Sequence, residues 1–290
     1  MRLRRIVAVA IVTALLRTAG ALADPVAVRH IEGTNRGLLA LRATDGRPLA
    51  SGEQTQTVSG DRITIHLVFR FKDGSLSDER TTFSQRGTFR LIRYQLAQKG
   101  PSFPRAIDMT IDAASGQVVV HSTDDHGESK TDTEHLELPP DVSNGMMNTV
   151  LKNVQPAALP VTVSYVAATP KPRVVKLVIQ NGGLAPFSAA GASYKATHYV
   201  IKIDIGGIEG LLAPLVGKEP PDSHVWILRG EAPVFVRSET TFYLGGPTWR
   251  IEPASIGWPA HARSGTVDDA GSEPLPHDER GRGARVRELH

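Results

Sequence analysis

The sequence predicts a mainly β protein, an antiparallel meander that forms a curved sheet, with one short helix near the middle of the chain. Apolar and polar residues alternate along many segments, which is the period of a half-buried strand. Turn residues separate these segments at short intervals, such as Asp45-Gly46 and Ser115-Gly116. No interval between them has room for a crossover helix, so the strands are expected to pair as antiparallel neighbours.

The clearest strand covers residues 62–72, where Ile63, Ile65, Leu67, Phe69 and Phe71 share one parity. Asp73-Gly74 fits a tight hairpin turn and leads into a second strand at 77–85. Further strands are predicted at 38–43, 88–97, 106–112, 117–122, 161–167, 173–180, 194–205, 224–229 and 234–244. The short joints favour one wrapped sheet over two small domains.

The helix is predicted at 139–154, where Asp141 is placed to cap its first turn. Its apolar stripe consists of Val142, Met146, Met147, Val150, Leu151 and Val154. Met146 and Met147 have two interpretations. They either fill the gap between helix and sheet or form an adaptable lid over an apolar cavity.

The two ends of the chain differ from the middle. Residues 1–23 have three arginines near the start, an apolar run and Ala21-Leu22-Ala23, the arrangement of a secretory signal peptide. The apolar run covers 11 residues, fewer than the roughly 20 that a membrane-spanning helix needs. Residues 259–290 lack aromatic side chains and periodicity, so we expect a disordered tail after a single β-rich domain at 24–258.

Charge and cysteine content narrow the class of protein. Four of the 33 Lys and Arg and none of the 30 Asp and Glu lie in the leader, which leaves 29 basic and 30 acidic residues. The mature chain therefore has a net charge of −1 and no basic stripe, which argues against a nucleic-acid partner. Without cysteine it forms no disulfides and takes no lipoprotein anchor. We expect a soluble, exported protein, periplasmic or secreted, with no stable membrane insertion.

Catalytic patterns are weak, and no catalytic residue or cofactor is predicted. There is no G-x-S-x-G elbow, and Asp222-Ser223-His224 are consecutive, so their side chains point apart. His121, His126 and His135 lie in a polar hairpin and could bind a divalent ion if two strands brought them together. Their spacing matches no dedicated metal motif, so a metal-assisted hydrolase stays an alternative.

Three consecutive charges interrupt the second strand of the hairpin, because Asp78, Glu79 and Arg80 cannot all lie on a polar face. One interpretation makes this strand a sheet edge whose charges prevent unwanted pairing. A second has Arg80 pair with Asp78 or Glu79 on a solvated face. In the third, one face of a strongly curved sheet lines a partly wet groove, where Glu79 and Arg80 meet the polar end of a ligand.

Several features follow an order that resembles a known group of proteins. These are the leader, the strand with Gly74, Leu76, Glu79 and Phe83, the "PPDVSNGM" helix and the "VWILRGEAPVFVRSE" hairpin. In this order and texture the chain resembles exported bacterial families of unknown function related to the lipoprotein-carrier (Lol-type) fold. The resemblance covers about residues 26–252. It implies an open β half-barrel with a helix across its mouth and an apolar concave face for acyl chains, but no catalytic residues. Charge on the concave face and the missing anchor cysteine depart from that group.

The sequence therefore favours an exported binding protein for an amphipathic or lipid-like ligand of the cell envelope. The predicted polar end of the site is formed by Glu79 and Arg80. The predicted apolar wall consists of Phe69, Phe71, Met146, Met147 and Trp226, although tryptophans in alternating strands are more often core residues. The other alternative is an envelope assembly factor that binds a partner protein by strand addition.

Overall fold

The computed structural model describes residues 25–123, 127–169, 171–189, 192–204 and 220–254. Eight strands precede the helix: β1 (Asn35–Ala43), β2 (Pro48–Ser59), β3 (Arg62–Phe71), β4 (Leu76–Ser84), β5 (Arg90–Lys99), β6 (Ile107–Asp112), β7 (Gln117–Thr123) and β8 (Ser129–His135). After α1 (Met147–Asn153) and a 3₁₀ turn, η1 (Pro156–Ala158), six strands follow: β9 (Val161–Ala167), β10 (Arg173–Ala189), β11 (Ala192–Asp204), β12 (Ser223–Leu228), β13 (Val234–Thr241) and β14 (Thr248–Pro253).

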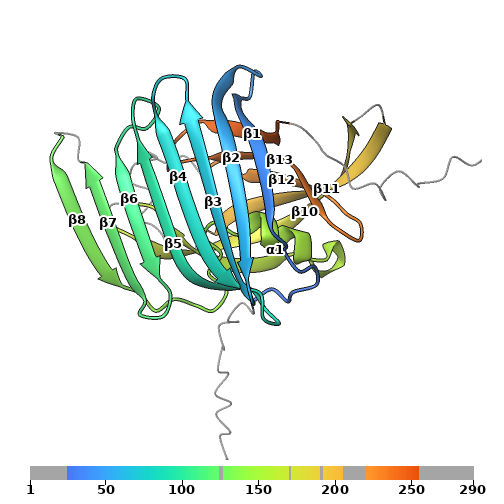
Figure 1. Cartoon of the computed structure of the whole chain (residues 1–290), viewed down its shortest axis with the longest axis horizontal. Helices are drawn as coiled ribbons and strands as arrows, with labels where there is room; N and C mark the ends of the chain where they lie inside the picture. Colours follow the sequence, from blue (N-terminus) through green and yellow to red (C-terminus); the bar gives the residue numbers. More distant parts are fainter. Residues whose placement is uncertain (1–24, 124–126, 170, 190–191, 205–219, 255–290) are drawn as a thin grey trace, which may run out of the picture. The chain divides into compact units, whose positions relative to one another are not determined.

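All fourteen strands belong to one antiparallel sheet made of two meanders. Strands β1 to β8 pair in sequence order, as do β9 to β14, and the β1–β14 ladder joins the two series, with Leu41 opposite Ile251. Figure 1 shows β2 to β8 side by side in one layer and β10 to β13 crossing behind them. Among the described residues β8 and β9 pair on one side only, so the sheet wraps around an interior without closing into a barrel.

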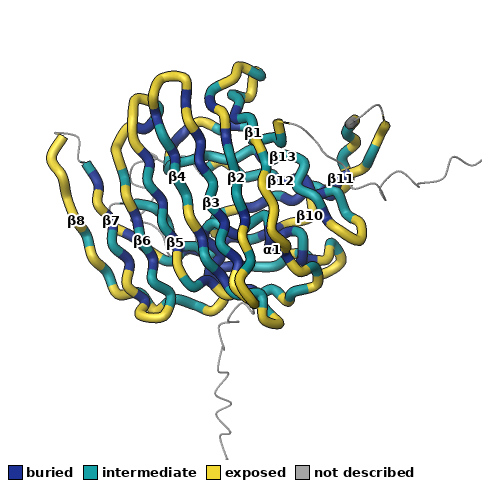
Figure 2. Tube along the Cα trace, in the orientation of Figure 1, coloured by how far each residue is buried: buried dark blue, intermediate teal, exposed yellow. Residues whose placement is uncertain are grey.

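The inner face of the wrapped sheet carries the core. Alternate residues of each strand point inward, which gives the repeated dark and light bands along the tube in Figure 2. The main apolar cluster joins both meanders to α1, because Met109 and Val120 pack in the same cluster as Val150, Ile179 and Tyr199. A mainly β, open antiparallel sheet with one α-helix on its concave side is thus confirmed as the fold.

The helix is shorter than the sequence predicted, and Asp141 does not cap it. Residues 141–144 instead lie along the edge of β9, where Ser143 N–H donates to the Ser164 carbonyl at 2.9 Å. The Asp141 carboxylate accepts a hydrogen bond from the Ser164 hydroxyl at 2.9 Å. Gly145, with φ +68°, turns the chain into α1, and a Cβ there would collide with Thr81 Oγ1.

Two sets of contacts at its C-terminal end hold this short helix, which would not be stable alone. The guanidinium of Arg229 donates hydrogen bonds to the carbonyls of Leu151, Lys152 and Val154 at 2.9–3.3 Å. These are carbonyls that the end of a helix leaves without partners. The amides of Arg29 and His30 both donate to Asn153 Oδ1 at 2.7 Å, so the N-terminal segment also fastens the end of α1.

The alternation of apolar residues missed three strands, β2, β8 and β14. β2 reads "PLASGEQTQTVS", and its inward positions include Gly52, Gln54 and Gln56. The predicted strand at 173–180 is also longer, because β10 continues to Ala189 in a long hairpin with β11.

The predicted leader and tail lie outside the described residues. Within the residues that are described, no helix has the length and apolar content needed to cross a membrane.

Candidate functional site: a cavity inside the wrapped sheet

A cavity of about 440 Å³ lies inside the sheet, and residues of both meanders and of α1 line it. β3, β4 and β5 supply one wall, including Leu67, Glu79 and Leu96. β10 to β13 supply much of the opposite wall, including Leu177 and Val225. The volume falls in the range of small-molecule sites.

Different structures border the two ends of the cavity. At one end α1 presents Met146, Met147 and Asn148. At the other lies an aromatic cluster with edge-to-face ring contacts, formed by Phe69, Phe71, Phe103, Phe242, Tyr243 and Trp249. A Cβ at Gly52 would collide with the Phe69 ring, so this glycine makes room for the cluster.

Glu79 is the acidic group of the cavity. On β4 it is flanked by Leu67 of β3 and Leu96 of β5, and its carboxylate oxygen Oε1 accepts a hydrogen bond of 2.8 Å from the Tyr94 hydroxyl. Burial raises the pKa of Glu79, because an apolar surrounding disfavours the charged form, and the Tyr94 hydrogen bond offsets this only in part. The group keeps some accessible surface because it borders the cavity.

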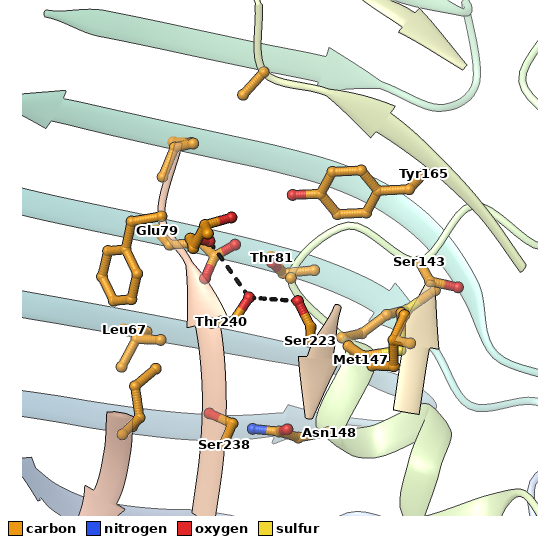
Figure 3. A pocket seen from close by; sticks show the side chains of 18 of the residues that line it. Leu67, Glu79, Thr81, Ser143, Met147, Asn148, Tyr165, Ser223, Ser238 and Thr240 are labelled. Atoms are coloured by element: carbon orange, nitrogen blue, oxygen red, sulfur yellow. Dashed lines mark hydrogen bonds between the residues drawn. The ribbon is translucent and has the colours of Figure 1, made fainter. Parts of the chain in front are cut away.

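Further hydroxyl groups surround this acid. In Figure 3 Tyr165 of β9 points toward the same space as Glu79, Thr81 and Thr240. Burial, with the nearby Glu79 charge, raises the pKa of Tyr165, so its hydroxyl stays protonated. Thr81 is 1% exposed, and its Oγ1 atom has no hydrogen-bond partner within the described residues.

Other polar groups of the lining already have partners. The hydroxyls of Ser223 and Thr240 are 2.8 Å apart. Lys152 of α1 lines the cavity, but its Nζ lies 2.9 Å and 3.1 Å from the two carboxylate oxygens of Glu32. Gln56 donates to the same Glu32 carboxylate at 3.1 Å. These contacts form the polar rim between α1, β2 and the N-terminal segment.

The structure brings together four of the seven predicted site residues. Phe69, Glu79, Met146 and Met147 line the cavity. Met146 is also 1% exposed and belongs to the main core, so it fills space between helix and sheet, whereas Met147 is only partly buried. The packing interpretation thus holds for Met146, while a lid role for Met147, which also packs against the core, stays a prediction.

The other three predicted residues lie elsewhere. Phe71 belongs to the aromatic cluster and does not line the cavity. Arg80 is exposed on the outer face of β4, 3.5 Å from His66 Nδ1, and Asp78 lies 2.8 Å from the other ring nitrogen of that histidine. β4 is also an interior strand of the sheet and not an edge. The three charged residues of β4 therefore lie on different faces of the sheet, with Glu79 on the inner face and Asp78 and Arg80 on the outer face.

Trp226 lies on the face of β12 opposite Val225, the residue that lines the cavity. The Trp226 ring stacks on the His198 ring, with 4.5 Å between their centroids. The guanidinium carbon of Arg237, a residue of β13, lies 4.1 Å from the centroid of the Trp226 ring. His198 Nε2 and His224 Nδ1 are 3.0 Å apart. Trp226 thus belongs to a packed outer cluster of β11, β12 and β13.

The predicted histidine cluster is not assembled by its strands. The β7–β8 ladder pairs His121 with Thr131 and His135 with Gln117, which separates the histidines by four residue positions, about 14 Å. His121 Nδ1 instead lies 2.8 Å from the Thr131 hydroxyl. His126 lies outside the described residues. Within the described part of the chain, no group of three or more metal-ligating side chains forms.

Sequence reasoning missed Tyr94, Tyr165 and Thr81 as site residues. Parity along the strands could have found two of them, since Tyr165 shares the inward face of β9 with Val163, and Thr81 shares that of β4 with Phe83 and Glu79. Their meeting around one carboxyl group could not be read from the sequence. It depends on β9 lying across the interior from β4, more than eighty residues away in the chain.

No protein-family model matches this chain, and no curated protein matches it by sequence. Among solved structures, it is similar to a β-barrel-like protein of a domain of unknown function, DUF1849, from Brucella abortus. The TM-score is 0.45 with 11% sequence identity over 77% of this chain and 96% of that one. No comparison reports a Lol-type carrier.

Proposed function

We propose that this protein is an exported binding protein that holds an amphipathic, lipid-like molecule non-covalently in the cell envelope. The observation that carries the proposal is the cavity of about 440 Å³, with apolar side chains in its walls and a partly buried carboxyl group among hydroxyls. Export and periplasmic or secreted location rest on the leader-like residues 1–23.

The lining suits a molecule with one apolar and one polar part. Leu67, Phe69, Leu177 and Val225 offer apolar surface, and each Å² that a ligand removes from water contributes about 25 cal/mol. Polar groups lie among these apolar side chains, and those around Glu79, which include Tyr94 and Tyr165, would orient the polar part of the ligand. Binding needs no covalent step and no cofactor.

Uptake of a neutral fluorescent probe tests the cavity directly. N-phenyl-1-naphthylamine gains fluorescence in apolar surroundings, and we expect saturable uptake by the wild-type protein. Leu67→Trp would place a large ring in the cavity. Losing about 60 Å² of ligand contact weakens binding by about tenfold, at about 25 cal/mol per Å².

Arg70→Trp is the matched control, because Arg70 lies on the same strand and is exposed. It should leave uptake unchanged. If wild-type protein takes up no probe, or both tryptophan variants bind it as well as wild type, the cavity is not a ligand site. Mass spectrometry of small molecules that remain with the natively purified protein would identify the occupant.

A further inference from the structure

The charges that line the cavity do not balance. Among the described residues only Glu79 and Lys152 are charged lining groups, and no histidine lines the space. Lys152 is neutralised by its ion pair with Glu32, whose carboxylate is buried. Of the ion pairs formed within the described residues, none includes Glu79. The cavity therefore presents an acid without a cationic partner.

The carboxylate of Glu79 can accept more hydrogen bonds than it receives. An ionised carboxylate can accept about four hydrogen bonds, and among the described residues Glu79 accepts one, from Tyr94. Thr81 Oγ1, buried beside it on the inner face of β4, has no hydrogen-bond partner among those residues. A buried polar atom without a partner costs about 1–3 kcal/mol, and of these two groups only Glu79 keeps accessible surface, so a ligand that donates to its carboxylate relieves part of this cost.

An anionic head group fits this environment poorly. A second carboxylate near Glu79 would bring two like charges together in apolar surroundings, and one of them would have to take up a proton. An alkylammonium group fits on both counts, because it carries a positive charge and three donors and accepts nothing. It would supply the charge and the hydrogen bonds that the cavity lacks.

We infer that the ligand is a cationic amphiphile, an apolar body with an amine head group that binds the carboxylate of Glu79. The inference rests on the proposed function, since it assigns a chemical class to the occupant of the same cavity. The apolar body would lie against Leu67, Phe69 and the wall formed by β10 to β12.

Three amphiphiles of equal chain length separate the head-group classes. Dodecylammonium, dodecanoate and dodecanol, each below its critical micelle concentration, would displace bound N-phenyl-1-naphthylamine at pH 7. We expect dodecylammonium to displace the probe from wild-type protein at a concentration at least tenfold below that of dodecanoate, with dodecanol between them. This comparison needs no variant and so does not depend on how a substituted protein folds.

Glu79→Gln then tests the residue, with Asp78→Asn as a control on the outer face of the same strand. The glutamine variant should lose the preference for the amine yet still take up the probe, and the asparagine variant should keep the preference. If dodecanoate binds wild-type protein as tightly as the amine, the cationic class is wrong while the cavity still binds ligands. If Glu79→Gln keeps the preference, Glu79 is not the head-group site. Absence of probe uptake by wild type would instead refute the proposed function itself.

Discussion

At the scale of single residues, Glu79 is a carboxylic acid that lies on the inner face of the sheet, where burial disfavours its charged form. Its cross-strand neighbours are Leu67 and Leu96, and its hydrogen bond comes from Tyr94. A residue that only stabilised the sheet would be apolar here. Asp78 and Arg80, one position away on either side, lie outside with His66, where water screens them.

The raised pKa of Glu79 predicts how stability depends on pH. The pKa of Glu79 in the folded protein lies above the ordinary value of 4.5. Its contribution to the free energy of unfolding is therefore fully present below pH 4.5 and is lost as the pH rises through the raised pKa. Glu79→Gln has no carboxyl group to ionise, so it removes this loss of stability. The titratable groups that face residue 79 are Tyr94 and Tyr165. We expect the variant to gain stability relative to wild type above pH 4.5, about 1.4 kcal/mol for each unit of pKa shift.

Urea unfolding of wild type and Glu79→Gln at a series of pH values measures the difference between their free energies of unfolding. Groups that titrate in the same way in both proteins cancel from this difference. The difference should rise and then become constant once the pH exceeds the raised pKa. A difference that stays the same from pH 4 to pH 8 would show that Glu79 ionises as it does in water.

At the scale of elements, α1 depends on Arg229, which donates to three carbonyls at the end of the helix. Arg229→Lys keeps the charge but loses the planar fork, so some of these carbonyls lose their partner. We expect a loss of about 1–3 kcal/mol in the free energy of unfolding. Amide hydrogen exchange should become faster in Met147–Asn153 before it does in the strands.

Arg70→Lys, an exposed substitution on β3, is the control and should change neither quantity. Equal exchange rates in α1 for wild type and Arg229→Lys would mean that packing of Val150 and Leu151 holds the helix without the arginine.

Elements with regular alternation were predictable from sequence, and those that form the site were less so. β3 was found because apolar side chains alternate along most of its length, with Val68 on the outer face as the exception. β2 was missed because Gln54 and Gln56 lie on its inner face, where they line the cavity, and Gly52 makes room for Phe69. The helix start was misplaced because Asp141 pairs with Ser164 of β9, a contact between residues distant in the chain.

At the scale of the whole molecule, the two meanders share one core. Met109 of β6 packs in the same cluster as Ile179 of β10 and Tyr199 of β11. The β1–β14 ladder also joins them through the backbone. We therefore expect the described domain to unfold as one cooperative unit.

Met109→Ala tests this coupling, since Met109 is fully buried and its truncation should cost about 2–5 kcal/mol. Trp226 and Trp249 report on the second meander by fluorescence, and circular dichroism reports on the whole sheet. Both midpoints in urea should fall together. Thr110→Ala, on the opposite face of β6, should have a much smaller effect. A tryptophan midpoint that stays in place while the dichroism changes would show that the meanders unfold separately.

The two edge strands of the sheet, β8 and β9, affect the size of ligand that the interior can hold. The diameter of a closed barrel is set by the number and stagger of its strands, so a closed barrel can hold a bulkier ligand only if backbone hydrogen bonds break. Here β8 and β9 are joined by chain rather than by a ladder. Widening the enclosure affects the free edge of β8 and the contacts of residues 141–144 with β9, so one sheet can hold molecules of unequal thickness while every existing strand pair stays intact.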